Sequence, residues 1–197
     1  MRRLYNFLYE KALEKSKGRK KTVMCAKLDQ LKGVSAEDIL KMAGQEDAVP
    51  VDLDKVVSTL GLYKESRDFS DIEKIEKRGK ICGLVLVIGD DVKIFFNSND
   101  GLNQKRFTAA HEIGHCCLHG ESLKNDYIEF LHKDGFKNKH EAEASIFASK
   151  LLIPKKSLFE VYNKLIKPSI NDLSEIFQVP HKIMKLRIKE EGLKTRG

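Results

Sequence analysis

The chain has 197 residues, of which 33% are charged and 41% hydrophobic, and it carries a formal net charge of +7. This length suits one well-packed domain with a small appendage, and no apolar run approaches the ~18 residues of a membrane-spanning helix. The basic N-terminus has neither a continuous apolar segment nor a small-residue cleavage site, so we expect a cytoplasmic protein without a secretory signal or a membrane partner.

The net charge is concentrated near the N-terminus. Residues 1–33 contain ten Lys or Arg and three Asp or Glu, whereas the remaining residues contain 26 of each. Apolar side chains at helical spacing predict an amphipathic helix over 2–16. We interpret residues 1–50 as a basic helical N-terminal extension that could contact nucleic acid, although a solvent-exposed charged helix face explains the same pattern equally well.

Two short helices with clear N-caps are predicted next. The stretch Ser35-Ala-Glu-Asp38 matches a capping box at the start of a helix that ends at Gly44. Asp52 is a suitable N-cap for a helix that has an apolar stripe and ends before Gly61. Residues 45–50 between the two helices are the candidate linker.

Residues 81–96 predict a β-hairpin. The run Ile81–Ile88 and the run Val92–Phe96 are joined by Gly-Asp-Asp, which is a turn sequence. The first strand is apolar on both faces, so it should lie between a helix layer and the rest of the core. Residues 66–80, which precede the hairpin, are mostly charged and indicate no regular element.

The C-terminal half is predicted to be helical. Helical periodicity extends over five segments, with a polar stretch at 121–139 between the first two. The five segments are 104–119, 141–152, 156–166, 170–177 and 181–190.

The first of these helices carries the motif His111-Glu112-x-x-His115. Residues four apart share a helix face, so the two imidazoles can bind one metal ion. Histidine is a common zinc ligand, and a carboxylate beside the ion can accept a proton from the attacking water. The motif therefore predicts a Zn²⁺ peptidase centre with His111 and His115 as ligands and Glu112 as the catalytic base.

A third protein ligand is expected on the second helix. Glu141 is favoured because neighbouring alanines would let that helix pack closely on the first, and Glu143 is the alternative third ligand. Ser145 shares a helix face with Glu141, so it could support a ligand from the second shell. A glutamate ligand on a second helix is typical of gluzincins, whereas the continuation that metzincins require does not follow His115.

Other side chains near the motif are candidates for supporting roles. His119 lies one turn beyond His115, but a straight helix rotates it too far for all three imidazoles to reach one ion. Tyr127 and His140 could stabilise a developing oxyanion, although ordinary surface roles are more frequent for such residues. The thiol of Cys25 could occupy the fourth metal position and keep the site inactive, although a small structural cysteine is again the more frequent role.

The cysteines indicate a reducing compartment. They are Cys25, Cys82, Cys116 and Cys117, and they form neither a disulfide framework nor a Cys-x-x-Cys pair. Cys116 and Cys117 are adjacent on a helix, where their side chains point about 100° apart and cannot readily pair.

Several stretches combine into one recognisable pattern. They are Pro50-Val-Asp-Leu-Asp-Lys-Val-Val, Ile81-Cys-Gly, Ile94-Phe-Phe-Asn97, Arg106-Phe-Thr-Ala-Ala-His-Glu-Ile-Gly-His115, Glu141-Ala-Glu-Ala-Ser-Ile-Phe-Ala-Ser-Lys-Leu-Leu-Ile-Pro154 and Leu173-Ser-Glu-Ile-Phe-Gln-Val179. Together they make the chain from about Val51 to Leu186 resemble the ImmA/IrrE family of metallopeptidases. The sequence departs from the family at Ser145, where Asn or Asp is usual, and at Pro180, where Ser is usual.

This resemblance implies an α+β fold with a zincin-like minimal metallopeptidase core, in which a small, mostly antiparallel sheet packs on the active-site helix. The core would span 51–168, between the N-terminal extension and a C-terminal helical segment, 169–197. The resemblance also implies a zinc-dependent endopeptidase that cleaves a helix-turn-helix repressor of a phage or mobile element. By position, His111, His115 and Glu141 would hold zinc and Glu112 would be the base.

An alternative function belongs to a different class. The chain could be a DNA-binding or protein-binding transcriptional regulator whose zinc site is vestigial or structural. The basic N-terminal extension and the helix lengths of segment 169–197, which suit a helix-turn-helix, favour this alternative.

Overall fold

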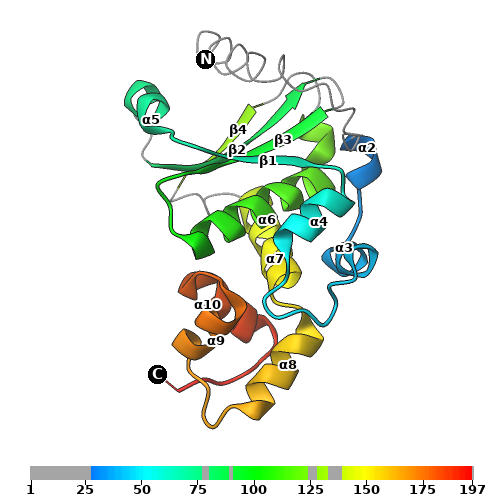
Figure 1. The fold of residues 1–197 in the computed structure, drawn as a ribbon, viewed down its shortest axis with the longest axis vertical. Coiled ribbons are helices and arrows are strands. Elements are labelled where there is room, and N and C mark those ends of the chain that lie inside the picture. The colour runs from blue at the N-terminus through cyan, green and yellow to red at the C-terminus, as the bar shows by residue number, and fades with distance from the viewer. Residues whose placement is uncertain (1–27, 77–79, 89–90, 124–127, 133–138, 197) are drawn as a thin grey trace.

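A small sheet lies at one end of the molecule and a group of short helices at the other, with two longer helices between them (Figure 1). The computed structural model describes residues 28–76, 80–88, 91–123, 128–132 and 139–196. The predicted helix over 2–16, Cys25 and Tyr127 lie outside these residues. The expected α+β fold is confirmed, because a small and mostly antiparallel sheet packs on the helix that carries the His-Glu-x-x-His motif.

The described helices and strands follow one another along the chain. They are α2 (Leu28–Leu31), α3 (Ala36–Ala43), α4 (Leu53–Thr59), β1 (Tyr63–Arg67), α5 (Ser70–Glu76), β2 (Ile81–Ile88), β3 (Asp91–Asn97), α6 (Leu102–His119), the 3-10 helix η1 (Gly120–Leu123), β4 (Ile128–His132), α7 (Lys139–Leu152), α8 (Lys155–Lys164), α9 (Ile170–Phe177) and α10 (His181–Glu190). The predicted C-terminal helices therefore form close to the expected positions.

The sheet has the strand order β1-β3-β2-β4. β2 pairs antiparallel with both β3 and β4, and β1 joins the other side of β3 in parallel. The predicted hairpin is confirmed and forms the centre of the sheet, while β1 and β4 are its edges.

β2 is covered on both faces, as its apolar sequence predicts. Val85 and Val87 belong to the main hydrophobic core, which includes α6. Leu84 and Leu86 point to the opposite face and pack in a second cluster with Phe69, next to α5. Successive side chains of a strand alternate between the two faces, so this one strand contributes to both cores.

The sequence patterns did not reveal several elements, among them β1, α5 and β4. β1 consists of the residues Tyr-Lys-Glu-Ser-Arg with exposed or half-buried side chains, and it becomes a strand through its pairing with β3. α5 is a single short helix within the charged stretch 66–80. Residues 128–132, within the polar stretch at 121–139 for which no strand was predicted, pair with β2 and form β4.

Two glycines allow α6 to approach both the sheet and α7 closely. A Cβ at Gly83 of β2 would collide with Thr108 Cγ2 on α6 and would lie 2.9 Å from the backbone oxygen of Phe95. A Cβ at Gly114 of α6 would lie 3.1 Å from the backbone oxygen of Ala144 on α7. The helix with the motif is therefore packed tightly between the sheet and α7.

The described N-terminal helices pack on this central pair. Ser35 caps α3 in a capping box with Asp38, and Asp52 caps α4, so both predicted N-caps are confirmed. α3 contacts α7, and its apolar residues belong to the main core. Residues 28–43 thus share a core with the segment after residue 50, and the predicted domain boundaries stay predictions.

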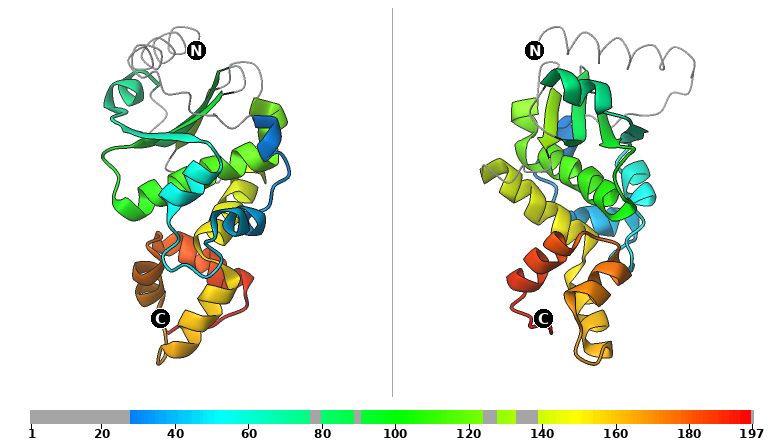
Figure 2. Two further views of the ribbon diagram at one scale, coloured as in Figure 1. Left: turned by 45° about the vertical axis from the view of Figure 1, so that its right-hand side comes forward. Right: turned by 90° about the vertical axis from the view of Figure 1, so that its left-hand side faces the viewer.

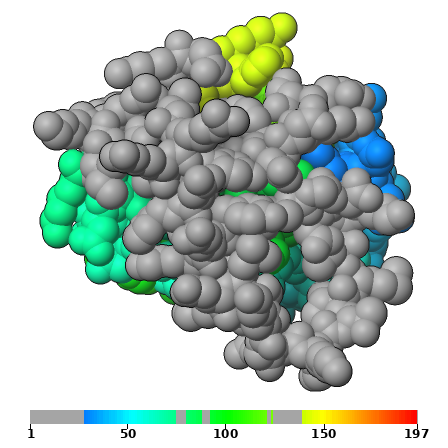
Figure 3. Space-filling view, turned by 90° about the horizontal axis from the view of Figure 1, so that it is seen from above, coloured from blue at the N-terminus to red at the C-terminus, as the bar shows by residue number. Residues whose placement is uncertain are grey.

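The C-terminal helices α8, α9 and α10 form a group at the end away from the sheet (Figure 2). Arg187 of α10 is buried, donates to the backbone oxygen of Ile153 at 3.1 Å and pairs with Glu191 at 2.6 Å. Seen from above, α5 and α2 lie on opposite flanks of the molecule (Figure 3). Among the helices that the structure describes, none combines the length and the apolar character needed to cross a bilayer.

Candidate metal centre

Four side chains of the predicted centre lie together in the interior. His111, Glu112 and His115 come from α6, and Glu141 comes from α7. Their exposed fractions are 0%, 1%, 2% and 8%, respectively. The spacing of four residues on α6 aligns the two imidazoles, and the close contact at Gly114 brings the carboxylate of α7 opposite them.

The donor atoms have the spacing that a tetrahedral metal ion requires. His111 Nε2 lies 2.9 Å from His115 Nε2 and 3.2 Å from one carboxylate oxygen of Glu141, Oε2. His115 Nε2 lies 3.4 Å from the other oxygen of the same carboxylate, Oε1. Zinc bonds of ~2.0–2.1 Å in a tetrahedron separate neighbouring ligand atoms by about 3.3 Å. The three residues therefore fit one ion of this size, and two imidazoles with one carboxylate form a suitable donor set.

The hydrogen bonds of Ser145 determine which nitrogen of His111 carries a proton. Ser145 Oγ donates to the backbone oxygen of Glu141 at 2.8 Å and lies 3.2 Å from His111 Nδ1. Because a hydroxyl has one proton, Ser145 must accept a hydrogen bond from Nδ1–H. His111 Nε2 is then left with the lone pair that a metal ligand needs. Ser145 thus has the geometry of a residue that supports a ligand.

A second chain of hydrogen bonds orients His115 in the same sense. His119 Nε2 lies 3.0 Å from Glu143 Oε2, so it donates to this carboxylate. The pKa of Glu143 is lowered chiefly by this contact. In a neutral imidazole the other nitrogen is an acceptor, and His119 Nδ1 lies 3.3 Å from His115 Nδ1. When an ion occupies the site, His115 therefore carries its proton on Nδ1, and its Nε2 is available as a ligand next to Glu141.

Burial and charge place the ligand candidates in the protonation states that metals bind. Burial lowers the pKa of His111, and this effect outweighs the opposing influence of Glu141. Burial also opposes the ionisation of Glu141, but its interactions with His111 and His115 outweigh this and lower its pKa to about 2. Near neutral pH the centre therefore contains a neutral imidazole and an ionised carboxylate.

Glu112 lies on the side of α6 that faces the sheet. A Cβ at Gly83 would lie 3.4 Å from Glu112 Oε1, so the carboxylate packs against β2 where this strand has no side chain. Glu112 follows His111 directly in the chain. Glu112 is therefore adjacent in sequence to a ligand candidate, but it is not one of the three residues whose donor atoms converge.

The other candidate side chains have different positions. Glu143, the alternative third ligand, is directed at His119 and not at His111 and His115. His140 stacks on His119 with ring centroids 4.3 Å apart and an interplanar angle of 26°. These two rings and Glu143 bring donor atoms close together, but the lone pairs of stacked imidazoles lie in nearly parallel planes and do not converge on one ion.

Arg106 has a structural role that the sequence did not reveal. It lies within the quoted pattern, on α6, and donates to the backbone oxygens of Val51 at 2.8 Å and of Gln178 at 3.2 Å. These partners are 55 and 72 residues away along the chain, so no local pattern predicts the contacts. Arg106 ties α6 to the segment before α4 and to the turn between α9 and α10.

Comparisons with known proteins give two matches. Residues 92–189 match the peptidase family model of the IrrE N-terminal-like domain. Over 129 residues the chain is 27% identical to metallopeptidase ImmA of Bacillus subtilis (strain 168), and the aligned part covers 64% of this chain and 75% of ImmA. Residues 92–189, which the family model matches, include α6 and α7, and these helices carry all four side chains of the centre.

Proposed function

Because the chain belongs to the ImmA/IrrE family of metallopeptidases, we propose that it is a zinc-dependent endopeptidase that cleaves a helix-turn-helix transcriptional repressor. The observation that carries this proposal is the convergence of donor atoms from three side chains, His111, His115 and Glu141, at distances close to tetrahedral spacing. The buried carboxylate of Glu112 belongs to the residue that follows His111 on the same helix. In this proposal the reaction is the hydrolysis of a peptide bond within a protein substrate.

His111, His115 and Glu141 would hold the zinc ion. When bound, Zn²⁺ would lower the pKa of a coordinated water toward ~7 and polarise the carbonyl of the scissile bond. Ser145 and His119 keep the protons of the two histidines on Nδ1, so that both Nε2 atoms stay available. Glu143 in turn holds His119 in the required orientation. Such supporting contacts raise the basicity of histidine ligands and fix their rings.

Glu112 is the general base and then the general acid. Its carboxylate accepts a proton from the attacking water and later donates that proton to the amine that leaves. Burial against β2 keeps this carboxylate in place beside the reacting atoms and excludes bulk water from it. The proton therefore moves from the water to the leaving group through one side chain.

The substrate would enter as an extended segment. β4 is an edge of the sheet, and an extended peptide can add to such an edge through backbone hydrogen bonds. A folded helix-turn-helix domain has no extended segment of this kind. Cleavage is therefore expected in a linker or in a locally unfolded part of the repressor.

The test uses the catalytic carboxylate and one ligand. The substrate to try first is a small helix-turn-helix repressor encoded beside this gene. Glu112→Gln should retain zinc, measured by metal analysis, and should lose cleavage of the repressor. His111→Ala should lose the zinc itself, whereas Glu37→Gln, at an exposed position on α3, should behave as the wild type. Cleavage by zinc-loaded Glu112→Gln at the wild-type rate would contradict the assigned mechanism.

A further inference from the structure

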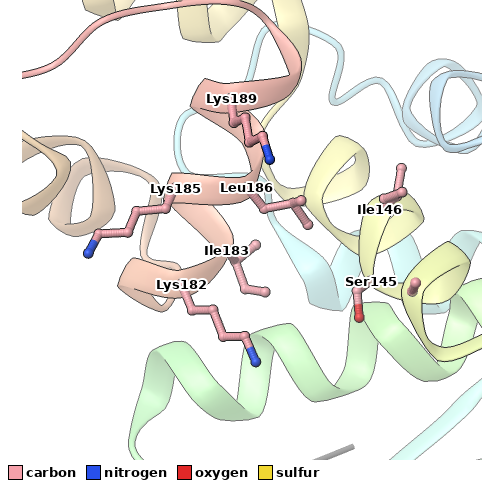
Figure 4. Close-up of a pocket in the computed structure, with 8 residues that line it drawn as sticks. Ser145, Ile146, Lys182, Ile183, Lys185, Leu186 and Lys189 are labelled. Carbon is pink, nitrogen blue, oxygen red and sulfur yellow. The ribbon is translucent and has the colours of Figure 1, made fainter. Parts of the chain in front are cut away.

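A groove lies between α7 and α10, next to the metal centre. It has a volume of about 340 Å³. Ser145 and Ile146 line it from α7, while Ile183 and Leu186 point into it from α10 (Figure 4). The walls are almost entirely apolar, and the proposed chemistry uses no part of the groove except Ser145.

Three lysines lie along the side of the groove that α10 forms. Lys182, Lys185 and Lys189 line it together with the apolar residues. Their spacing of three and four residues places them along one side of the helix, over about 10 Å at the α-helical rise per residue. Within the described part of the chain, neither Lys185 nor Lys189 has a carboxylate at ion-pair distance. The nearby Glu190 is instead directed at Ser149 and Arg187.

The groove reaches the metal centre through one side chain. Ser145 lines the groove and also accepts the hydrogen bond from His111 Nδ1. The groove therefore lies on the Nδ1 side of His111, away from the Nε2 donor. A molecule bound there leaves the proposed cleavage site open.

We propose that the groove between α7 and α10 docks an acidic amphipathic helix of the protein substrate. This inference rests on the proposed peptidase function and specifies how the substrate is recognised. Apolar side chains of the docked helix fill the groove beside Ile146, Ile183 and Leu186. Its acidic side chains, one helical turn apart, pair with the lysines of α10. Amphipathic helices bind apolar grooves in this way, with anchor residues at i, i+3, i+4 and i+7.

A helix of a protein fits the groove better than two other occupants. Sites for small molecules contain several polar groups that fix the orientation of the ligand. Here Ser145 is the buried polar side chain in the lining, and its hydroxyl is already engaged by Glu141 and His111. Duplex DNA would engage the lysines through phosphates but would leave the apolar groove unfilled. An apolar centre with a charged rim is the composition of a protein interface.

Docking a helix at this site also resolves a difficulty of the proposed substrate. A helix-turn-helix repressor is mostly helical, whereas the edge of the sheet accepts an extended segment. A helix bound at the groove stays folded while an adjoining linker reaches the metal centre. The two sites therefore select a helix and a flexible segment in the same substrate.

The experiment measures peptide binding to the full chain in the zinc-loaded Glu112→Gln form, so that the peptide is not cut. The probe is a short fluorescent peptide of leucine and glutamate with leucines at i, i+3, i+4 and i+7. Comparison peptides replace every glutamate by lysine or shuffle the sequence to remove the spacing. Fluorescence anisotropy should show binding of the acidic amphipathic peptide alone, weakened by added salt.

Substitutions locate the site. Lys185→Glu with Lys189→Glu should weaken binding on the order of tenfold or more, since two attractive contacts become repulsive. Leu186→Gln should weaken it through the apolar part of the groove. The matched control, Lys41→Glu with Lys164→Glu, changes the same charge at exposed positions on α3 and α8 and should leave binding unchanged.

Three results would overturn the proposal. They are equal binding of the acidic and basic peptides, no loss of binding in the Lys185 and Lys189 variant, and duplex DNA binding that this variant alone abolishes. Zinc content is measured in every variant. Loss of peptide binding with zinc retained identifies a failure of docking. Intact peptide binding in an enzyme that cleaves no repressor identifies a failure of the peptidase function instead.

Discussion

Ser145→Ala is the sharpest test of how the metal ligands are held. In the wild type, Ser145 Oγ accepts the hydrogen bond from His111 Nδ1, which is completely buried. Alanine removes this acceptor without adding bulk. A buried donor that loses its partner costs ~1–3 kcal/mol. His111 can avoid this cost by moving its proton to Nε2, but that nitrogen then has no lone pair for zinc.

The loss should therefore appear in metal affinity. A cost of ~1.4–2.8 kcal/mol corresponds to a 10–100-fold weaker affinity, and substitutions behind metal ligands commonly have effects of about this size. The fold should be little affected, because the hydroxyl of Ser145 donates only to a carbonyl in its own helix. Zinc affinity is measured by competition with a chromophoric chelator, and folding by circular dichroism.

Ser149→Ala is the matched control. Ser149 lies one turn further along α7, is equally buried and donates to the backbone oxygen of Ile146, but it does not contact a candidate metal ligand. It should retain wild-type zinc affinity. If Ser145→Ala binds zinc as tightly as the wild type, or if Ser149→Ala loses as much affinity, the assigned role of Ser145 is wrong.

Three further predictions concern packing and charge. Gly83→Ala should lower the free energy of unfolding by ~1–3 kcal/mol in urea titrations, because the added Cβ collides with Thr108. Gly101→Ala, where the added Cβ has open space around it, should lower the free energy of unfolding by less. Burial raises the pKa of the Cys117 thiol to about 12, so this thiol should resist alkylation near neutral pH until the protein unfolds; reaction in the native state would contradict its assigned burial. Burial opposes the ionisation of Glu191, but the interactions with Lys155 and Arg187 outweigh this effect and keep the pKa of Glu191 below 4.5. The ionised carboxylate therefore stabilises the fold above pH 4.5, and this stabilisation is lost as the pH falls through the lowered pKa. The difference in melting temperature between the wild type and Glu191→Gln should shrink on acidification, and a constant difference would refute the assignment.

Elements with a local signal were predicted well from the sequence. Ser35 and Asp52 cap their helices with their own side chains, so a few adjacent residues specify each start. The apolar run of β2 reflects burial on two faces of the sheet. In both cases the physical cause lies within the segment itself, and a single sequence contains it.

Elements that depend on distant partners were not predictable in this way. β1 has half-exposed polar side chains, and its hydrogen bonds to β3 make it a strand. Gly83 would suit a turn as well as a strand, and only the structure shows that Thr108 and Glu112 occupy the space beside it. A glycine in a sequence does not say which side chain approaches it.

In the candidate centre, too, local features were predictable from the sequence and contacts between distant residues were not. The helical spacing of His111 and His115 is a local property, and the preference for Glu141 rested on the small alanine side chains near it in the same helix. The contact between His119 and Glu143 joins residues 24 positions apart on two helices. In the sequence, each of the two residues was a candidate metal ligand. In the structure, they contact each other instead.

The position of α7 connects these observations. One face of the helix carries Glu141 and Ser145 to the metal centre, and a neighbouring face lines the groove with Ile146. Its C-terminal end is held to α10 by Arg187, which donates to the backbone oxygen of Ile153, the residue directly after α7. Since the third candidate ligand belongs to α7 and the other two belong to α6, the geometry of the centre depends on how α7 is seated. The C-terminal helices therefore contribute to the metal centre without supplying a ligand, and a core that ended at residue 168 would lose the contacts that seat α7.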